Sequence, residues 1–432
     1  MIARWAFSNR AMSRKYVVVL AAAAVLALAF DLVLSAAAAE PAEVTFSTAF
    51  EGGSLGRIEK LGDTTFRVHI LGQQDERGHN RAATWYCFRM DHVQGRDLTI
   101  TLTDFVGEYN DVPGSVPMNE KIRPAMSEDG RTWNHAEDMT WDKEKKEATV
   151  RLKPKQDSVW LATQAMYPHS RFMALAEELK PSPHARIEVI GKSAQGRDLL
   201  LITITDFAKP DTDKKTIWLQ ARQHAWEGGT SYVAEGALRF AVSNTPEARA
   251  LRENNVCIFT PMVAVDGCAI GLPRFNVHGF DPNRHWDEVN LRDKRYLELM
   301  PEVWYFKKAI LSHVGRGGRI DLMLNMHNTE TGEYVATQAE DMASLTKMNV
   351  LYDRLLAATS FDPAPPQKLR SGGPASGNTN WLYQEARIPV MLMEQRIGFS
   401  TKLKRWPTVK DRLEFGPALL VAMAAGARAG DK

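Results

Sequence analysis

Two residues three positions apart, His224 and Glu227, follow an apolar run at 216–220. An imidazole and a carboxylate at this spacing can turn toward one point when the backbone curls, and such ligands suit zinc. His327, at the end of the run 319–326, is the best-placed third ligand. Three protein ligands leave one coordination position for water, which is typical of a catalytic zinc site and not of a structural one.

A glutamate that closes an apolar strand is the next candidate for chemistry. Glu394 follows the run 388–393. A carboxylate at such a place is costly to bury unless it is paired or kept for proton transfer. Glu330 and Glu333, just past His327, are competing acids. Because both stand in a polar loop, we expect their carboxylates to be solvated.

Three side-chain donors gather on a stretch rich in glycine and proline. Arg274, Asn283 and Arg284 all lie within residues 271–286. Guanidinium and amide groups on a loop can hold a carboxylate or a developing oxyanion. A solvated or structural arginine is the commoner alternative for either guanidinium.

Strands that alternate with helices bring these residues together in the sequence-based fold. The alternation over residues 185–425 predicts an α/β domain with a mixed, partly parallel sheet flanked by helices. In such sheets, sites form at the carboxyl ends of strands, and each candidate metal ligand and Glu394 stands at or just past a strand end. The predicted strands are 186–190, 199–205, 216–220, 256–260, 319–326 and 389–393, and the predicted helices are 232–242, 301–313 and 342–358.

The preceding stretch, residues 44–165, has a different pattern. Short runs put apolar or β-branched residues on one face and are separated by turn segments such as Asp-Glu-Arg-Gly. This spacing predicts a small antiparallel β-sandwich domain. The predicted strands include 65–70, 84–89, 98–102 and 148–152, and a helix is expected at 169–179.

The first 39 residues are typical of an export signal. Four basic residues precede the apolar run 17–30, and the small-residue stretch 35–39 ends in an A-x-A pattern. Asp31 leaves the run shorter than the ~20 residues that a membrane span needs, so we expect cleavage and a periplasmic or secreted bacterial protein with no stable membrane span. A retained anchor is the alternative.

Charge and cysteine content exclude further classes of function. Removing residues 1–39, with four basic residues and one acidic, takes the formal net charge from +2 to about −1. Bulk charge therefore gives no indication of nucleic-acid binding. The three cysteines, Cys87, Cys257 and Cys268, are too few for a cysteine-rich zinc site, and buried thiols are the favoured reading.

Taken together, the motifs resemble those of the M14 zinc metallocarboxypeptidases over residues 185–425. The preceding domain is similar to the β-sandwich of the cytosolic-carboxypeptidase subfamily. The segments that carry the resemblance, in chain order, are Phe46 to Leu55, Trp85 to Phe88, Met166 to Ser170, His224-x-x-Glu227, Asp266-Gly267, Gly279 to Trp286, His327 and Glu394.

The resemblance implies a role for each matching residue of the metal centre. His224, Glu227 and His327 would bind one zinc ion per chain. Glu394 would act as general base and then as general acid. Arg274 would stabilise the oxyanion.

The resemblance also implies how a peptide with a free C-terminal carboxylate would bind. Asn283 and Arg284 would hold that carboxylate, and the small polar segment around Thr379 would line the side-chain pocket. Arg370 and Arg387 are close enough in sequence to favour acidic end groups, although either could be an ordinary surface residue.

The sequence departs from the family pattern in three places. Digestive members carry a mobile tyrosine where this chain has the segment 369–374, which contains none. That absence removes a cap over the substrate and puts its end-group contacts in doubt. Pro282 replaces a leucine, and Ala264 replaces an asparagine; both changes look structural.

The expected function is hydrolysis of the C-terminal peptide bond of peptides by metal-activated water. A zinc amidase or deacylase on the same scaffold, acting on cell-wall peptides or acylated amino acids, is the first alternative. A catalytically inactive binding protein is the second, although the intact set of ligands, base and arginine argues against it. Neither the oligomeric state nor the amino acid removed follows from the sequence.

Overall fold

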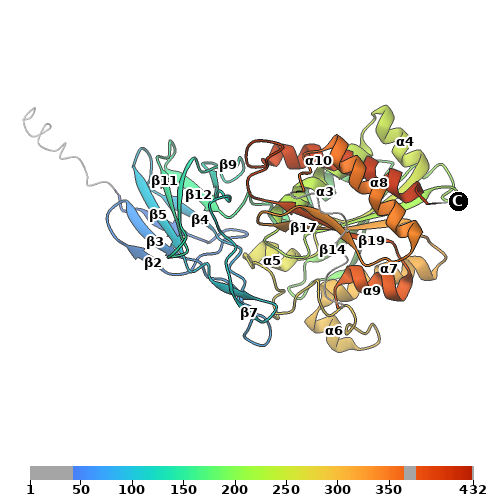
Figure 1. The fold of residues 1–432 in the computed structure, drawn as a ribbon, viewed down its shortest axis with the longest axis horizontal. Helices are drawn as coiled ribbons and strands as arrows, with labels where there is room; N and C mark the ends of the chain where they lie inside the picture. The colour runs from blue at the N-terminus through green and yellow to red at the C-terminus, as the bar shows by residue number, and fades with distance from the viewer. Residues whose placement is uncertain (1–41, 364–375, 431–432) are drawn as a thin grey trace, which may run out of the picture. The chain divides into compact units, whose positions relative to one another are not determined.

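The computed structural model describes residues 42–363 and 376–430 (Figure 1). Residues Val44–Lys432 form one compact unit, so the division between residues 165 and 185 stays a prediction. The expected export signal, 1–39, and the segment 369–374 lie outside the described residues. Among the described helices, none is long and apolar enough to cross a membrane.

The N-terminal part is built from two five-stranded sheets and a separate two-stranded hairpin, β6–β7. The sheets have the orders β1-β4-β12-β8-β9 and β10-β11-β5-β3-β2. The strands are β1 (Thr45–Ser47), β2 (Ile58–Lys60), β3 (Thr65–His69), β4 (Cys87–Asp91), β5 (Leu98–Thr103), β6 (Gly107–Tyr109), β7 (Val112–Ser115), β8 (Ala125–Ser127), β9 (Asn134–His135), β10 (Asp138–Asp142), β11 (Glu147–Leu152) and β12 (Ser158–Ala162).

Alternating side chains join these two sheets through one core. Phe66 and Val68 of β3 are buried while their neighbours are half-buried, which is the period-2 pattern of a strand with one covered face. They share a cluster with Phe88 of β4 and Leu161 of β12, in the other sheet. The predicted sandwich is therefore present, with one difference from the expected antiparallel pairing: β3 and β5 run parallel.

The C-terminal part contains a seven-stranded sheet in the order β13-β14-β16-β15-β17-β19-β18. The four strands β16, β15, β17 and β19 pair in parallel, and the outer pairs are antiparallel, which confirms the mixed sheet. Its strands are β13 (Ala185–Lys192), β14 (Asp198–Ile204), β15 (Lys215–Ala221), β16 (Asn255–Thr260), β17 (Leu322–Thr329), β18 (Tyr334–Thr337) and β19 (Val390–Arg396).

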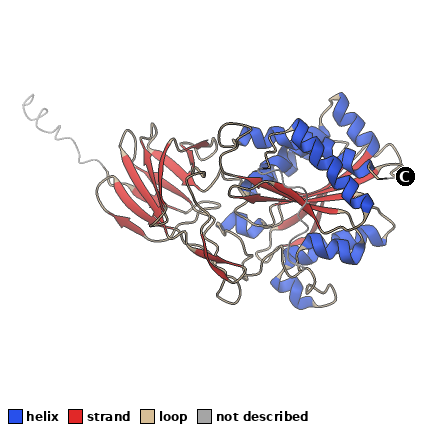
Figure 2. Ribbon diagram, in the orientation of Figure 1, coloured by secondary structure: helices blue, strands red, loops and turns tan. Residues whose placement is uncertain are grey.

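Helices cover both faces of this sheet (Figure 2). Alternate side chains of β15 pack into two different hydrophobic clusters. Ile217 and Leu219 belong to the cluster that includes residues of α3, α8 and α10, and Trp218 belongs to the cluster that includes residues of α7 and α9. A strand that is buried on both faces has a nearly continuous run of apolar residues in its sequence. The helices are α2 (His169–Leu179), α3 (Gly228–Val242), α4 (Pro246–Asn254), α5 (Val265–Ile270), α6 (Lys294–Leu299), α7 (Pro301–Gly315), α8 (Met342–Ala358), α9 (Asn378–Ala386) and α10 (Val409–Arg428).

The longest of these helices, α10, was missed by the sequence analysis. Pro417 lies inside its 20 residues, and an internal proline ordinarily argues against a helix. The start of α10 is fixed by a capping box between Thr408 and Asp411. Packing against α3 and α8 stabilises it further, because most helical stability in proteins comes from tertiary contacts.

The three cysteines are buried and unbonded. Burial raises the pKa of the Cys268 thiol, and it raises the pKa of Cys257 to about 12. These thiols therefore act as small apolar side chains of the core, as the sequence favours.

Candidate active site

The turn that carries His224 and Glu227 connects the end of β15 to the start of α3. The chain leaves β15 through Arg222, whose φ of 60° is in the left-handed region. The buried guanidinium of Arg222 donates from Nε to the carbonyl of Ala225 at 2.7 Å, which fixes the loop from inside. Glu227 is the residue before the first turn of α3, where the helix dipole favours a negative charge.

The third predicted ligand reaches the same place along a neighbouring strand. β17 runs parallel to β15, with Ala221 and Met326 as partners in the register. His327 is the next residue of β17, so it lies beside the turn after β15. The juxtaposition depends on sheet order, because the residues are about 100 positions apart along the chain.

The two imidazoles converge on one carboxylate. Nδ1 of His224 lies 2.7 Å from Oε1 of Glu227, and Nδ1 of His327 lies 3.0 Å from its Oε2. One ligand atom from each residue lies within 4.8 Å of the others, and all three side chains are buried. The described residues contain one other such group, His79, Glu108 and Asp111, which is mostly exposed.

A second layer of polar residues orients the imidazoles. Nε2 of His224 lies 3.1 Å from Oδ1 of Asp281, and Asp281 is held by the guanidinium of Arg274 at 2.7 Å. A proton on Nε2 that faces this carboxylate leaves Nδ1 with a lone pair for a metal. Nε2 of His327 lies 2.9 Å from the side-chain amide of Asn325.

The charges of the group keep its carboxylates ionised. Burial alone would raise the pKa of Glu227, but His224 and His327 outweigh it and lower that pKa to about 2. Burial is likewise outweighed at Asp281, where Arg274 and His224 hold the pKa well below its usual range. Two imidazoles and an ionised carboxylate, all with donor atoms directed to one point, fit a zinc ion.

Glu394 lines the same cavity as these candidate ligands. It pairs with His327 across β17 and β19 in the register, and it is half-buried. Its Oε2 is shielded from solvent and has no hydrogen-bond partner among the described residues. Burial, followed by the negative charges of Glu227 and Glu330, raises the pKa of Glu394 well above its usual range.

The predicted carboxylate-binding pair lies in the turn after Asp281. Asn283 is buried, with its amide nitrogen 3.3 Å from Nε2 of His327. Arg284 donates from one amino group to the carbonyl of Asn283 at 2.9 Å. Over the described chain, no carboxylate lies within ion-pair distance of Arg284, whereas Arg274 is paired with Asp281. Arg284 is therefore a cleft cation with no carboxylate partner among the described side chains.

Two family models match the chain in consecutive ranges. One, described as Zinc carboxypeptidase, matches residues 170–334, and the other, described as Cytosolic carboxypeptidase N-terminal domain, matches residues 46–163. The chain belongs to the M14 zinc carboxypeptidase family.

Curated relatives in this family are longer than the present chain. Mouse cytosolic carboxypeptidase 6 is 28% identical over 260 residues, which are 56% of this chain and 46% of that protein. Mouse cytosolic carboxypeptidase 3 is 22% identical over 335 residues, which are 72% of this chain and 31% of that protein. The chain thus spans less than half the length of these two relatives.

Solved structures with the same M14 fold cover nearly the whole chain. A metallo-carboxypeptidase from Burkholderia cenocepacia is 19% identical, with a TM-score of 0.75 over 89% of this chain and 99% of that one. A metallo-carboxypeptidase from Pseudomonas aeruginosa is also 19% identical, with a TM-score of 0.73 over 88% and 98%. At this identity the likeness establishes the fold alone.

The M14 cleft is a cavity of about 880 Å³ lined by both parts of the chain. The C-terminal part contributes the metal-ligand group, Glu394, Arg274, Asn283 and Arg284. The N-terminal part contributes Asp75 to Arg77 and the tip of the β6–β7 hairpin, including Tyr109. The contribution of the N-terminal part was not predicted, because Asn110-Asp111 indicates a turn but not which distant residues the turn will contact.

Other predicted cleft residues have different surroundings. Thr379 is buried at the start of α9, and its hydroxyl donates to the side-chain oxygen of Asn378 at 3.1 Å. Its predicted role in the side-chain pocket stays a prediction. Arg387 stacks on the ring of Tyr383, with 5.5 Å from Cζ to the ring centroid, and Arg370 lies outside the described residues.

The expectation that Glu330 and Glu333 are solvated is wrong for Glu333. Glu333 is buried, and its carboxylate accepts hydrogen bonds from the backbone N–H groups of Asp362 and Arg396. Glu330 is half-buried and lines the cleft. Burial raises the pKa of both residues. The polar sequence around Glu330 and Glu333 does not indicate that the tertiary structure will bury Glu333.

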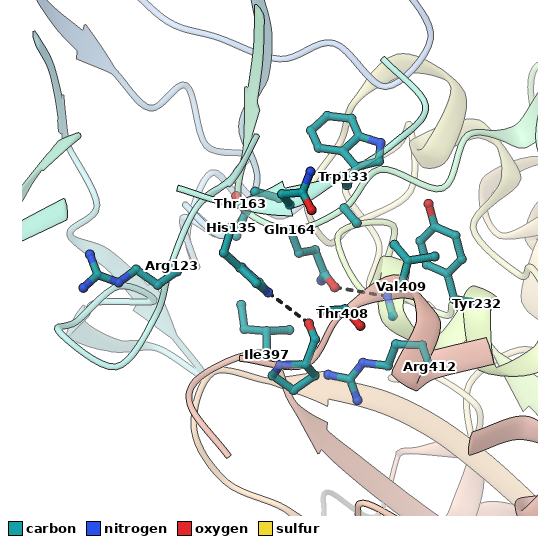
Figure 3. Close-up of a pocket in the computed structure, with 15 residues that line it drawn as sticks. Arg123, Trp133, His135, Thr163, Gln164, Tyr232, Ile397, Thr408, Val409 and Arg412 are labelled. Atoms are coloured by element: carbon teal, nitrogen blue, oxygen red, sulfur yellow. Dashed lines mark hydrogen bonds between the residues drawn. The ribbon is translucent and has the colours of Figure 1, made fainter. Parts of the chain in front are cut away.

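A second, much smaller cavity lies where the N-terminal and C-terminal parts meet (Figure 3). Its volume is about 30 Å³, roughly the space of one water molecule. Nε2 of His135 lies 3.0 Å from the carbonyl of Pro407, and the side chain of Gln164 accepts from the N–H of Gly229 at 3.1 Å. These hydrogen bonds join the two parts of the chain. The cavity between them is too small for a peptide substrate.

Proposed function

We propose that this chain is a zinc-dependent metallocarboxypeptidase that hydrolyses the C-terminal peptide bond of peptides. One observation carries the proposal: a buried group of candidate metal ligands, a carboxylate with a raised pKa and an arginine with no carboxylate partner among the described residues share one cleft. Each of these features, taken alone, can be explained by a structural role without catalysis. Together they match the requirements of exopeptidase chemistry, namely a Lewis acid, a proton carrier and an anchor for a terminal carboxylate.

His224, Glu227 and His327 would hold the metal. When bound, zinc would lower the pKa of a water ligand and polarise the substrate carbonyl. The ligand set agrees with this assignment, because three nitrogen and oxygen ligands leave a position open for water.

Glu394 would move the protons of the reaction. In its ionised form the carboxylate accepts a proton from the attacking water and then delivers it to the leaving amine. Its raised pKa suits this double role, because a carboxylate with an ordinary pKa is a weak base and a poor acid near neutral pH. Its unpartnered Oε2 leaves an acceptor available for that proton.

Two arginines would each bind a different negative charge of the substrate. Arg274, fixed by Asp281, presents a guanidinium at the rim of the metal-ligand group and would stabilise the oxyanion. Arg284, assisted by the amide of Asn283, would bind the free terminal carboxylate. Docking of that carboxylate places the last amide bond beside the metal-ligand group, which gives selectivity for chain ends.

Paired substrates test the proposal directly. We expect the zinc-loaded protein to release the last amino acid from peptides with a free C-terminus, and a chelator should abolish this release until zinc is restored. The same peptides with an amidated C-terminus should be cleaved at least about 100-fold more slowly, since the charged anchor is lost. Equal cleavage of both forms would favour the amidase or deacylase alternative. No metal-dependent cleavage of any peptide would contradict the proposal.

Export of the chain is a separate proposal. It rests on the basic, apolar and small-residue pattern of residues 1–39, while the curated relatives bear the name cytosolic. N-terminal sequencing of the protein from fractionated bacterial cells tests it. A mature start near Glu40 in the periplasm or medium is expected, and an intact N-terminus in the cytoplasm would contradict it.

A further inference from the structure

The β6–β7 hairpin carries a tyrosine to the cleft from the N-terminal part of the chain. Tyr109 ends β6 and pairs with Val112 across a two-residue turn. Asn110 and Asp111 in that turn have φ values of 51° and 60°, and positive values at both central residues are typical of a tight type I′ hairpin. Tyr109 is 47% exposed, so part of its ring and the cleft it lines remain open to a ligand.

The tip of the hairpin contacts both cleft arginines. The ring of Tyr109 lies against Arg274, with 5.2 Å from Cζ to the ring centroid. One amino group of Arg284 lies 3.4 Å from the hydroxyl of Tyr109 and 3.4 Å from Oδ1 of Asn110. Tyr109 therefore bridges the guanidinium proposed for the oxyanion and the one proposed for the terminal carboxylate.

The hairpin is held in this position from its base. Arg81 donates from one amino group to the carbonyls of Asp104 and Val106 at 2.9 and 2.8 Å, just before β6. Its own carbonyl accepts from the N–H of Glu108 at 3.1 Å. At the tip, Arg77 pairs with Asp111 at 2.7 Å. Contacts at both ends orient Tyr109 before any substrate binds, which lowers the entropic cost of using it.

The hydrogen-bonding capacity of Tyr109 suits an anion on Arg284. Its hydroxyl accepts from the guanidinium, so its own proton is available to a further acceptor. A carboxylate bound to Arg284 is that kind of acceptor, and bonds to charged groups are the stronger ones. Because 3.4 Å is long for a hydrogen bond, Arg284 is only loosely engaged by the hairpin and can turn toward an anion.

We propose that Tyr109 is a substrate-binding residue whose hydroxyl donates to the terminal carboxylate held by Arg284, and whose ring orients Arg274. The N-terminal part of the chain then supplies one wall of the carboxylate subsite. This inference rests on the proposed carboxypeptidase function and deepens it.

Tyr109→Phe and Tyr109→Ala separate the two roles on the full-length, zinc-loaded protein. Tyr109→Phe keeps the ring on Arg274 and removes the hydroxyl, so KM for a free-C-terminal peptide should rise about tenfold with kcat within about twofold. Tyr109→Ala should raise KM similarly and also lower kcat several-fold, since Arg274 loses its stacking partner. Phe207→Ala is the matched control, because Phe207 is 39% exposed and stacks on Arg186 at 4.9 Å but does not line the cleft.

A binding measurement makes the test independent of turnover. Calorimetry with the released amino acid should show about tenfold weaker binding to Tyr109→Phe than to the wild type, and with its carboxamide no difference between the two. Unchanged KM and unchanged binding of the amino acid in both variants, with an active wild type, would overturn the inference and leave the carboxypeptidase proposal intact. Equal weakening for the amino acid and its carboxamide would also overturn it, because the contact would then be to another part of the ligand. An inactive wild type would instead contradict the proposed function itself.

Discussion

Glu394 differs from the other acids of the cleft in having an oxygen that is shielded and unpartnered. Glu227 and Asp281 are kept ionised by imidazole and guanidinium neighbours, whereas Glu394 has two carboxylates among the charges that act on it. Burial raises the pKa of all three carboxylates; positive neighbours outweigh it at Glu227 and Asp281, whereas at Glu394 the neighbouring carboxylates raise the pKa further. Under the proposed roles, this separation of pKa values distinguishes the proton carrier, Glu394, from the metal ligand, Glu227, within one small site.

Glu394→Gln should retain the metal and lose the reaction. The substitution preserves the shape of the side chain and removes its basicity, so kcat should fall by about 100-fold or more at unchanged zinc content. Elemental analysis together with turnover measures both quantities. His224→Ala is the informative comparison, since it should lose stoichiometric zinc as well as activity. Turnover close to that of the wild type in Glu394→Gln would refute the assigned role.

Glu330→Gln should shift the pH dependence of the reaction. Burial raises the pKa of Glu394 most, and the negative charges of Glu227 and Glu330 raise it further. Removing the charge of Glu330 makes ionisation of Glu394 easier, so its pKa falls. Because the base must be ionised to act, the acidic limb of the kcat profile should move to lower pH. A limb that stays in place or moves to higher pH would show that Glu330 does not act on Glu394.

At the scale of elements, two helices approach so closely that glycines are required between them. A Cβ on Gly236 of α3 would lie 2.0 Å from the carbonyl oxygen of Leu413, and one on Gly416 of α10 would lie 2.3 Å from that of Val233. α3 begins directly after Glu227. The contact with α10 therefore supports the helix that positions the candidate metal ligand Glu227, although no described residue of α10 lines the cleft.

Gly236→Ala should destabilise the protein by about 2 kcal/mol or more, because the helices must separate to admit the methyl group. Urea denaturation of the zinc-free protein measures the change without a contribution from metal binding. Gly315→Ala is the control: Gly315 ends α7, and its Cβ would meet no atom within 4 Å. That variant should be neutral or more stable by up to about 1 kcal/mol. Similar losses in both variants would mean that the helix contact is not the cause.

At the scale of the whole molecule, one buried acid outside the cleft affects stability. Glu302, in the first turn of α7, is 1% exposed, and its Oε2 has no hydrogen-bond partner. Burial, followed by the charge of Asp266, raises its pKa from 4.5 to about 7. Between these two values the folded protein binds more protons than the unfolded chain, so stability falls as the pH rises.

Glu302→Gln should remove this part of the pH dependence. The shift from 4.5 to about 7 corresponds to about 3 kcal/mol of lost stability above pH 7, and the neutral amide avoids it. Urea denaturation at pH 5 and pH 8 should show a smaller difference for the variant than for the wild type. Glu298→Gln on α6, at an exposed position, is the control and should leave the difference unchanged. An identical pH slope in Glu302→Gln and the wild type would contradict the prediction.

Strands buried on both faces were the easiest elements to predict. β15, β16 and β19 stand in the sequence as apolar runs, and their predicted ranges match the structure within about three residues. The short strands β8 and β9 were missed, since three-residue and two-residue segments carry too little pattern. α10 was missed because Pro417 interrupts it, and only its packing against α3 identifies it as one helix.

Residue types and their order along the chain were sufficient to predict the candidate metal centre and its proposed general base: two imidazoles and two carboxylates at strand ends, in the order of a known family. Those choices can be read from residue types, because metal binding and proton transfer admit few side chains. The residues that surround the candidate metal centre could be identified only from the tertiary structure. It buried Glu333 and brought Tyr109 to Arg284, 175 positions further along the chain. Such contacts depend on how separate sheets and hairpins pack, and no local pattern of residues records that packing.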